Sequence, residues 1–294
     1  MNWVGKFRTP ISMFTLLESS PTMQLIIKHT TRYGYAEPLL YSIQQLKLTP
    51  QDGFGQRVKQ WSIQMNGQPH QHVDAYGNIV HTLVVDKNLS EINVTAKGEV
   101  ETGLPHSETR EKLPLAIYLR QTHLTQPGLG IKELARSLGT IDSVTGLQQL
   151  SEMIVERVPY TKGSTSVFTT ASQALETGTG VCQDHAHIFI ACCRSLNIPS
   201  RYVSGYLFTE RGDLLESHAW AESWLPNNGW ISVDVSNRCL ANGSHVRLAV
   251  GLDYRDACPV SGIRVGGGYE SMSVGVDVSQ MGTLSKKQME QSQQ

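Results

Sequence analysis

A cysteine follows a glycine-rich turn near the middle of the chain, in the segment TGVCQDHAHIFIACC that begins at residue 179. The pattern places Cys182 on the first turn of a predicted helix that runs to about Leu196. Unpaired N–H groups at a helix N-terminus favour negative charge, so they lower the pKa of a thiol below the ~8.5 of free cysteine. The same groups can form one side of an oxyanion hole. The position suits a nucleophilic thiolate, and a small core residue is the competing interpretation.

A base and an acid follow in the segment ESHAWAESWLPNNGWISVDVSN, residues 216–237. His218 begins one predicted strand, and Asp234 ends the strand that returns after the PNNG turn. A nucleophilic cysteine needs a general base and a group that orients that base. The order Cys182, His218, Asp234 supplies a thiol, an imidazole and a carboxylate for these three roles.

The register of this hairpin decides whether the imidazole and the carboxylate meet. A two-residue turn at Asn227–Asn228 would pair residues whose numbers sum to 455, which puts His218 and Asp234 on opposite faces. A connection with an odd number of residues, or a bulge, puts them on the same face. We therefore predict one of these two features.

A metal site is the alternative for the cysteine, because Cys182, His185 and His187 form a CxxHxH pattern. On a helix, positions 182 and 185 share a face, whereas position 187 points elsewhere. Structural zinc usually takes four ligands, and no second ligand pair is evident. We expect no metal and no cofactor, and we interpret both histidines as structural.

Strand-like segments dominate the first third of the chain. They are rich in Ile, Val, Thr and Tyr and are separated by turn residues, which is typical of a small antiparallel β-sandwich. The motif PHQHVD, with His70, His72 and Asp74, is interpreted as a solvated loop or strand edge rather than a metal site. The expected strands are 24–33, 41–49, 56–66, 78–86 and 90–101.

Helical spacing begins after Gly103, and strands return after Pro199. The expected helices are 113–122, 131–139, 146–158, 171–176 and 182–196; the expected strands are 200–208, 217–225 and 229–236. The fold class is therefore α+β. The predicted organisation is an N-terminal extension (1–22), a β-sandwich domain (23–108), a catalytic domain (109–284) and a polar tail (285–294).

Composition excludes several classes of protein. The formal net charge is −1, so the chain lacks the excess of basic residues that is typical of a nucleic-acid-binding protein. Five cysteines, two of them adjacent, do not form an obvious disulfide framework. No membrane span and no clear signal peptide are visible, so a cytoplasmic location without membrane partners is expected. The residues do not specify an oligomeric state.

Three segments in order resemble the bacterial transglutaminase-like family, a branch of the papain-like cysteine fold: GTGVCQDHAHIFIACCRSLNIPSRYVSGY, SHAWAESWLPNNGWISVDVSN and VGLDYRDACPVSG. The resemblance covers about residues 142–280, and the β region before it is similar to the N-terminal domain that such proteins commonly carry. It implies Cys182 as the nucleophile, His218 as the general base and acid, and Asp234 as the residue that orients the imidazole. DVSN replaces the usual Asp-Pro-Thr-Asn, and Leu252 stands where an arginine is common.

Further candidates for the substrate pocket or the oxyanion hole surround these three residues. Trp220 lies two residues after His218, on the same face of an ideal strand, where it would wall the site. Gln183 follows the thiol, and Gln173 lies before the glycine-rich turn; no spacing rule fixes either as an oxyanion donor. The resemblance adds Tyr254 and Asp256 as pocket residues.

The predicted activity is attack on a peptide or amide carbonyl through a thioester. Transfer of the acyl group to water gives a cysteine peptidase or amidase, which is preferred because no amine site is visible. Transfer to an amine gives a transglutaminase or a peptide-bond-forming enzyme. A non-catalytic module that only binds a peptide is the alternative from another class. In each case the expected partner is a peptide or protein.

Overall fold

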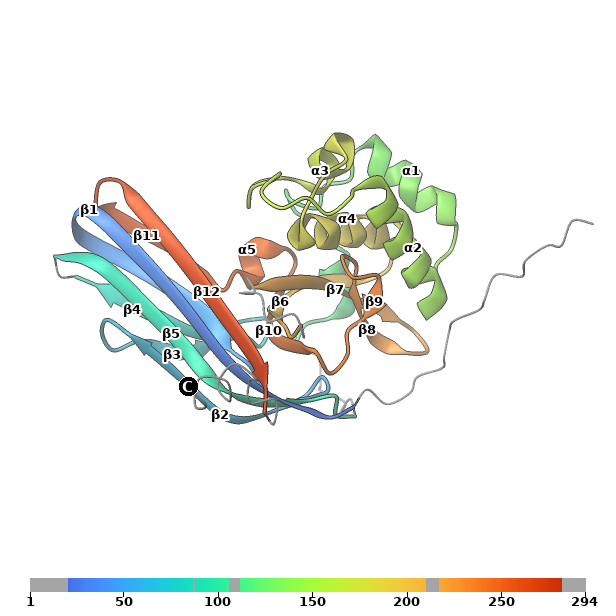
Figure 1. Ribbon diagram of the computed structural model, residues 1–294. Coiled ribbons are helices and arrows are strands. Elements are labelled where there is room, and N and C mark those ends of the chain that lie inside the picture. Colours follow the sequence, from blue (N-terminus) through green and yellow to red (C-terminus); the bar gives the residue numbers. More distant parts are fainter. Residues whose placement is uncertain (1–20, 87, 106–111, 210–216, 282–294) are drawn as a thin grey trace, which may run out of the picture.

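The computed structural model describes residues 21–86, 88–105, 112–209 and 217–281. Most of the predicted N-terminal extension and the predicted polar tail lie outside the described residues. A large curled antiparallel sheet lies beside a second sheet that carries helices on one side (Figure 1). The predicted α+β fold class is confirmed.

The first sheet is built on one very long strand. The two segments predicted as 24–33 and 41–49 form the single 27-residue strand β1 (Met23–Thr49). Buried residues alternate along its first half, at Leu25, Ile27 and His29, as expected when one face of a strand packs on a core. The other strands of this sheet are β2 (Gln56–Met65), β3 (His70–Val73), β4 (Ile79–Val85), β5 (Leu89–Thr102), β11 (Val260–Gly266) and β12 (Glu270–Gln280).

A single curled sheet replaces the two separate sheets of the predicted sandwich. The strand order is β2-β5-β1-β4-β3, and β11 and β12 also pair with β1. The register along β1 shifts between Gly34 and Leu39 where β5 pairs with it. The two halves of β1, represented by Leu25 and Leu46, nevertheless contribute to one buried cluster. The sheet therefore encloses its own core, as a sandwich does.

The last two strands cross the predicted domain boundary. The predicted second domain, 109–284, includes residues 260–280, yet β11 and β12 pair with β1 of the first sheet (Figure 1). The sequence pattern indicates that these residues form strands. It contains no signal for their pairing partner, which lies more than 200 residues earlier in the chain.

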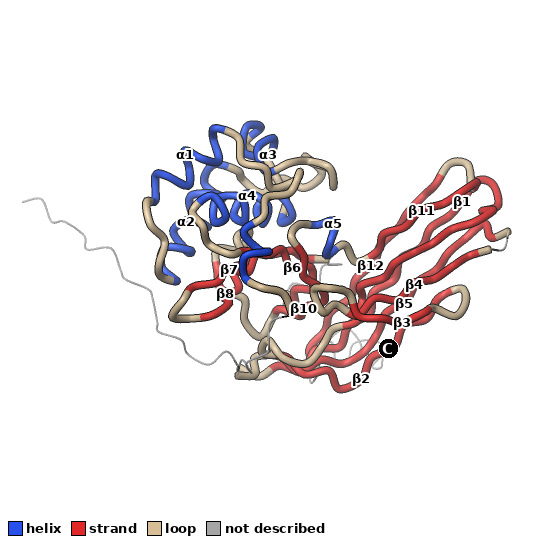
Figure 2. Tube along the Cα trace, turned by 180° about the vertical axis from the view of Figure 1, so that it is seen from behind, coloured by secondary structure: helices blue, strands red, loops and turns tan. Residues whose placement is uncertain are grey.

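The second sheet has the order β10-β6-β7-β8-β9, and helices pack against it (Figure 2). All but one of the predicted helices and strands of this region are found close to their expected bounds; 113–122 contains only a short 3-10 turn, η1 (Leu115–Leu119). The helices are α1 (Leu129–Leu138), α2 (Val144–Arg157), α3 (Ala171–Thr177), α4 (Cys182–Ser195) and α5 (Tyr254–Ala257). The strands are β6 (Ser200–Leu207), β7 (His218–Leu225), β8 (Gly229–Asp234), β9 (Cys239–Leu240) and β10 (His245–Gly251).

The two sheets share buried contacts. Tyr206, Val246 and Leu248 of the second sheet belong to the buried cluster of the first. The Asn78 side chain donates to the carbonyl of Val250 at 2.8 Å. These contacts fix the curled sheet against the edge of the second sheet that contains β10.

A buried ion-pair network lies in the same region. The Glu222 carboxylate accepts hydrogen bonds from Arg201 Nε at 2.6 Å and from Arg247 Nε at 3.1 Å. The ring centre of Phe54, from the loop between β1 and β2, lies 3.8 Å from the Arg247 guanidinium carbon. Glu222 lies on the same strand as His218, so this network helps to fix the strand that carries the imidazole.

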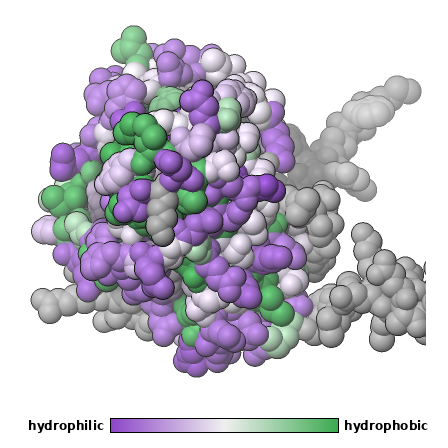
Figure 3. All heavy atoms as spheres, turned by 90° about the vertical axis from the view of Figure 1, so that its left-hand side faces the viewer, coloured by the Kyte–Doolittle hydropathy of each residue, from purple (hydrophilic) through white to green (hydrophobic). Residues whose placement is uncertain are grey.

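The outer end of the first sheet exposes apolar side chains, including Leu40, Ile263, Val265 and Tyr269. Seen from that side, hydrophobic groups lie among hydrophilic ones (Figure 3). Within the described ranges, no helix combines the length and the hydropathy needed to cross a membrane.

Candidate active site

Local backbone geometry places Cys182 at the start of α4. Gly178 has the left-handed conformation (φ 66°, ψ 25°) that caps α3, which glycine adopts without steric cost. A Cβ on Gly180 would lie 2.9 Å from Cβ of Asp184, so this position also requires glycine. Asp184 accepts a hydrogen bond from the Val181 N–H at 2.8 Å and caps the helix. The glycine-rich turn and this cap together begin the helix at Cys182.

The environment of Cys182 differs from that of the other cysteines. All five thiols are free, and Cys182 is half-buried at the end of a helix. Burial raises the pKa of the other four thiols, to about 11 for Cys193 and about 12 for Cys239, with Cys192 and Cys258 also raised. Those four thiols therefore carry little thiolate at neutral pH.

The hairpin formed by β7 and β8 has the predicted odd connection. Ala221 pairs with Val233 and Leu225 with Gly229, so the numbers of paired residues sum to 454. Three residues, 226–228, connect the strands. This register puts His218 and Asp234 on the same face of the hairpin, and the prediction is confirmed.

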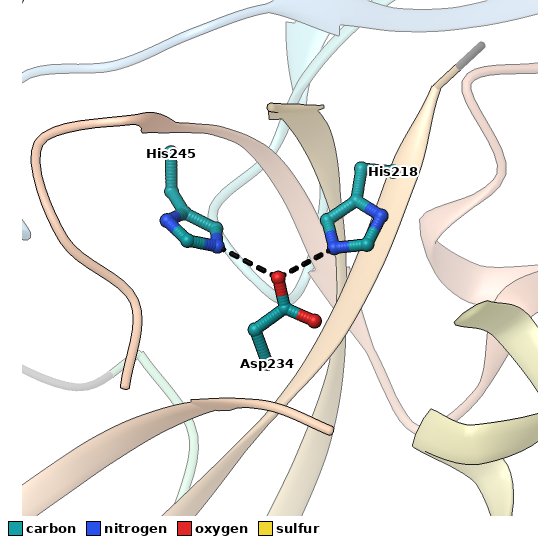
Figure 4. Close-up of side chains that lie close together, drawn as sticks. All are labelled: His218, Asp234 and His245. Atoms are coloured by element: carbon teal, nitrogen blue, oxygen red, sulfur yellow. Dashed lines mark hydrogen bonds and ion pairs between the residues drawn. The ribbon is translucent and has the colours of Figure 1, made fainter. Parts of the chain in front are cut away.

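His218 is in direct contact with the buried carboxylate of Asp234. Its Nε2 is 2.8 Å from Asp234 Oδ2 (Figure 4). Cys182 also acts on this ring, because it is one of the groups that raise the pKa of His218. Burial disfavours the charged ring, but the hydrogen bonds and charges of Asp234 and Cys182 outweigh burial and raise the pKa of His218 to about 10. These interactions therefore favour the protonated, imidazolium form of His218.

Asp234 is fully buried and has more partners than the sequence indicated. Its Oδ2 accepts from Asn237 Nδ2 at 2.6 Å and lies 3.0 Å from His245 Nε2. Burial alone would raise its pKa, but the hydrogen bonds and charges of His218 and His245 lower the pKa well below the usual range. Asn237, the last residue of the DVSN motif, thus contacts the carboxylate of Asp234, the first residue of the motif.

His245 and Asn237 are site residues that sequence reasoning missed. Asn237 follows Asp234 by three residues, and an aspartate side chain commonly accepts hydrogen bonds from residues of the turn that it begins. This spacing is a signal that could have identified Asn237. His245 begins β10, which is separated from β8 by two strands in the sheet. No spacing rule predicts that the chain brings His245 across the end of the sheet to Asp234.

The ligand atoms of His218, Asp234 and His245 lie within 4.8 Å of one another, the one such group in the described part of the chain. Both imidazole Nε2 atoms are at hydrogen-bond distance, 2.8 and 3.0 Å, from the same carboxylate oxygen. At these distances a hydrogen atom lies between each Nε2 and the oxygen, and Oδ2 also accepts a hydrogen bond from Asn237. The contacts are those of a hydrogen-bond network.

The CxxHxH pattern does not gather into one group of ligands. His185 Nε2 lies 2.7 Å from the Val158 carbonyl oxygen, and its Nδ1 lies 2.8 Å from the Ser236 hydroxyl. His187 is fully buried, and its Nε2 accepts from the backbone N–H of Tyr254 at 3.2 Å. Both rings therefore have structural hydrogen bonds.

Of three predicted pocket residues, Trp220 packs against the site, whereas Tyr254 and Asp256 have other contacts. The ring of Trp220 lies 6.1 Å from that of His218 and 5.3 Å from that of His245, so it forms a wall beside both imidazoles. The Tyr254 ring packs 6.2 Å from Tyr202, whose pKa is raised by burial and, to a smaller extent, by Cys182. Asp256 accepts hydrogen bonds from the Tyr76 hydroxyl at 2.7 Å and from the backbone of Leu252 at 2.9 Å, which links the two sheets.

The two glutamines have other hydrogen bonds. Gln173 Oε1 accepts from the Thr170 N–H at 2.9 Å in the capping box of α3, which is a helix-capping role. Gln183 is buried, and its side chain donates to the Val167 carbonyl at 3.4 Å. Both side chains therefore have local structural hydrogen bonds.

The comparisons with known proteins agree with this geometry. Residues 132–235 match the family model of the Transglutaminase-like superfamily. Residues 25–101 match the Bacterial transglutaminase-like N-terminal region. The chain therefore contains a transglutaminase-like core, preceded by the N-terminal region found in bacterial transglutaminase-like proteins.

Some similar proteins match most of the chain, and others match only about a third of it. An uncharacterized protein of Mycobacterium leprae is 28% identical over 275 residues, which is 87% of this chain and 98% of the relative. A protein-glutamine gamma-glutamyltransferase of Pseudomonas aeruginosa is 33% identical over 104 residues, which is 31% of this chain and 16% of that protein. A crystal structure titled "Putative Cysteine Protease", from Cytophaga hutchinsonii, has a TM-score of 0.72 at 22% identity and covers 89% of this chain and 92% of that one. This last likeness shows that the fold is shared.

Proposed function

We propose that this protein is a cysteine enzyme that attacks peptide or amide carbonyls, with Cys182 as nucleophile, His218 as general acid and base, and Asp234 as the residue that orients His218. One observation carries the proposal: the buried Asp234 carboxylate holds the His218 imidazole at 2.8 Å. The half-buried Cys182 at the start of α4 is among the groups that raise the pKa of this imidazole. This is the arrangement that activates a nucleophile.

The chemistry follows from the positions of these groups. The Cys182 thiolate adds to the carbonyl carbon, and the N–H groups at the start of α4 stabilise the developing oxyanion. The His218 imidazolium donates its proton to the leaving amine, so the C–N bond breaks and a thioester forms. Neutral His218 then removes a proton from water as the water oxygen adds to the acyl carbon, and the C–S bond of the thioester breaks. The products are a carboxylic acid and the original thiolate–imidazolium pair.

Hydrolysis is the proposed outcome, and a peptide or protein is the proposed substrate. An amine in place of water would give transfer through the same thioester, and the match to a protein-glutamine gamma-glutamyltransferase supports this second candidate. The two differ only in which nucleophile reaches the acyl-enzyme.

Mass spectrometry of the intact protein after brief treatment with limiting iodoacetamide across pH 5–9 tests the activated nucleophile. We expect one adduct, on Cys182, formed well below pH ~8.5 and lost in His218→Ala; Cys182→Ala is the control. Equal, slow alkylation of Cys182 and Cys239 would favour a peptide-binding module without catalysis.

A second assay separates hydrolysis from transfer. Glutamine-containing peptide amides are incubated with the full chain, with and without a labelled primary alkylamine. Release of ammonia or peptide fragments without label incorporation supports hydrolysis, whereas label incorporation that depends on Cys182 supports transfer.

A further inference from the structure

We propose that His245 is a positioning residue of this site: it holds the Asp234 carboxylate, which in turn holds His218. The inference rests on the proposed function, because a positioning role has meaning only if the Cys182–His218 pair reacts. His245 lies on β10, Asp234 on β8 and His218 on β7, so three strands meet at one carboxylate oxygen (Figure 4).

The contacts of the His245 ring determine which nitrogen carries its proton. The backbone N–H of Asn242 lies 3.1 Å from His245 Nδ1, and a backbone N–H can only donate. Nδ1 is therefore the acceptor, and Nε2 carries the proton that it donates to Asp234 Oδ2 at 3.0 Å. The Asn242 side-chain oxygen lies 3.3 Å from the same Nδ1 and would accept from it if the ring were protonated. In both states Nε2 donates to Asp234.

His245 also has a fixed position. The residue is 7% exposed, and the Trp220 ring packs against it at 5.3 Å and 80°. The titratable side chains next to it are Asp234 on β8 and His218 on β7, and neither strand pairs with β10. Its one donor is aimed at the Asp234 carboxylate, so this hydrogen bond links His245 to the proposed reaction.

The hydrogen bond from His245 has a chemical consequence for His218. Oδ2 of Asp234 takes three donors: His218 Nε2, His245 Nε2 and Asn237 Nδ2. Donors to a carboxylate stabilise its ionised form, so Asp234 does not take the proton from His218. They also restrict rotation of the carboxylate, so the His218 ring is held in one orientation. Loss of one donor weakens both effects.

Two substitutions separate donation from packing. His245→Phe keeps a ring of similar volume and removes the donor, whereas His245→Gln keeps an N–H near the position of Nε2. We expect His245→Phe to slow iodoacetamide alkylation of Cys182 at pH 7 about fivefold, the size of one lost hydrogen bond. The pH of half-maximal reaction should move toward the ~8.5 of a free thiol. His245→Gln should restore both values to within about twofold of the wild-type protein.

The Asp234→Ala background provides a further control. If His245 acts through Asp234, adding His245→Phe to Asp234→Ala changes the alkylation rate no further. Circular dichroism and thermal unfolding verify that each variant folds; His245→Met, which also lacks an N–H, is used if the phenylalanine variant does not fold.

The outcomes distinguish the two proposals. Wild-type rates in His245→Phe, or equal losses in the Phe and Gln variants, would show that His245 only packs, and would leave the proposed function intact. If wild-type Cys182 reacts no faster than Cys239, the proposed function fails, and the positioning role fails with it.

Discussion

His218 Nε2 and Asp234 Oδ2 lie 2.8 Å apart because the strands that carry them are joined by three residues. With that register, Asp234 lies one step beyond the Ala221–Val233 pair, opposite Trp220, and Trp220 shares a face with His218. A two-residue turn would have moved the carboxylate to the other side of the sheet. The contact between His218 and Asp234 therefore depends on the number of residues in this turn.

The charge of Asp234 should matter beyond its shape. In Asp234→Asn the side chain keeps its size but loses the negative charge that stabilises the His218 imidazolium. We expect amide cleavage or transfer to fall about 10²-fold, the size of a general acid–base contribution. Steady-state kinetics with a glutamine-containing peptide measure this change. Asp142→Asn, at an exposed acid before α2, is the matched control and should retain full activity; an unchanged rate in Asp234→Asn would contradict the assigned role.

The proton on His218 should persist to high pH. Hydrogen bonds and charges from Asp234 and Cys182 outweigh burial and raise its pKa to about 10, so the ring stays protonated below that pH. In Asp234→Ala the burial remains and the main stabilising partner is gone, so the pKa should fall well below the wild-type value. Nuclear magnetic resonance titration of the histidine ring protons measures both values, with His218→Gln for assignment. A wild-type His218 that titrates near 6.5 would refute this picture of the site.

The buried carboxylate of Glu222 should make stability depend on pH. Burial opposes its ionisation, but Arg247 and Arg201 lower its pKa from 4.5 to about 2. Because the folded-state pKa is lowered, the stabilisation is complete above pH 4.5 and is lost as the pH falls through about 2. Glu222→Gln should cost about 3–5 kcal/mol at pH 7, as for a broken buried ion pair, and less at pH 3.

Urea unfolding at pH 7 and pH 3 measures the difference between the wild-type protein and Glu222→Gln. Glu91→Gln is the control, because its pair with Arg32 is exposed to solvent and should change stability far less. The same loss at both pH values would contradict the lowered pKa of Glu222.

Gly205 should be intolerant of any side chain. A Cβ there would lie 2.5 Å from the Trp220 ring and closer still to the Val246 carbonyl oxygen, so Gly205→Ala should destabilise the fold by about 1–3 kcal/mol. Displacement of Trp220 should also reduce alkylation of Cys182, because this ring packs against His218 and His245. Gly275→Ala is the matched control, since no atom lies within 4 Å of the added Cβ. Equal unfolding midpoints for the two variants would show that the packing around Trp220 is looser than the structure indicates.

The sequence by itself determined most of the local structure and three residues of the site. Periodicity and turn residues indicated α2, α4 and the β7–β8 hairpin within a few residues, because side-chain spacing and backbone preference act locally. Residue types and order singled out Cys182, His218 and Asp234, since only a few side chains can serve as nucleophile, base and orienting acid. The odd connection could be predicted because the period of a strand is fixed at two residues.

Only the tertiary structure decided how distant strands pair. It placed residues 260–280 on β1 of the first sheet, and it brought His245 to Asp234 across the end of the second. It also gave Gln173 a capping role and Asp256 a role between the sheets. Hydrogen bonding between strands is the same for any partner, and burial depends on the whole chain, so no local pattern specifies such contacts.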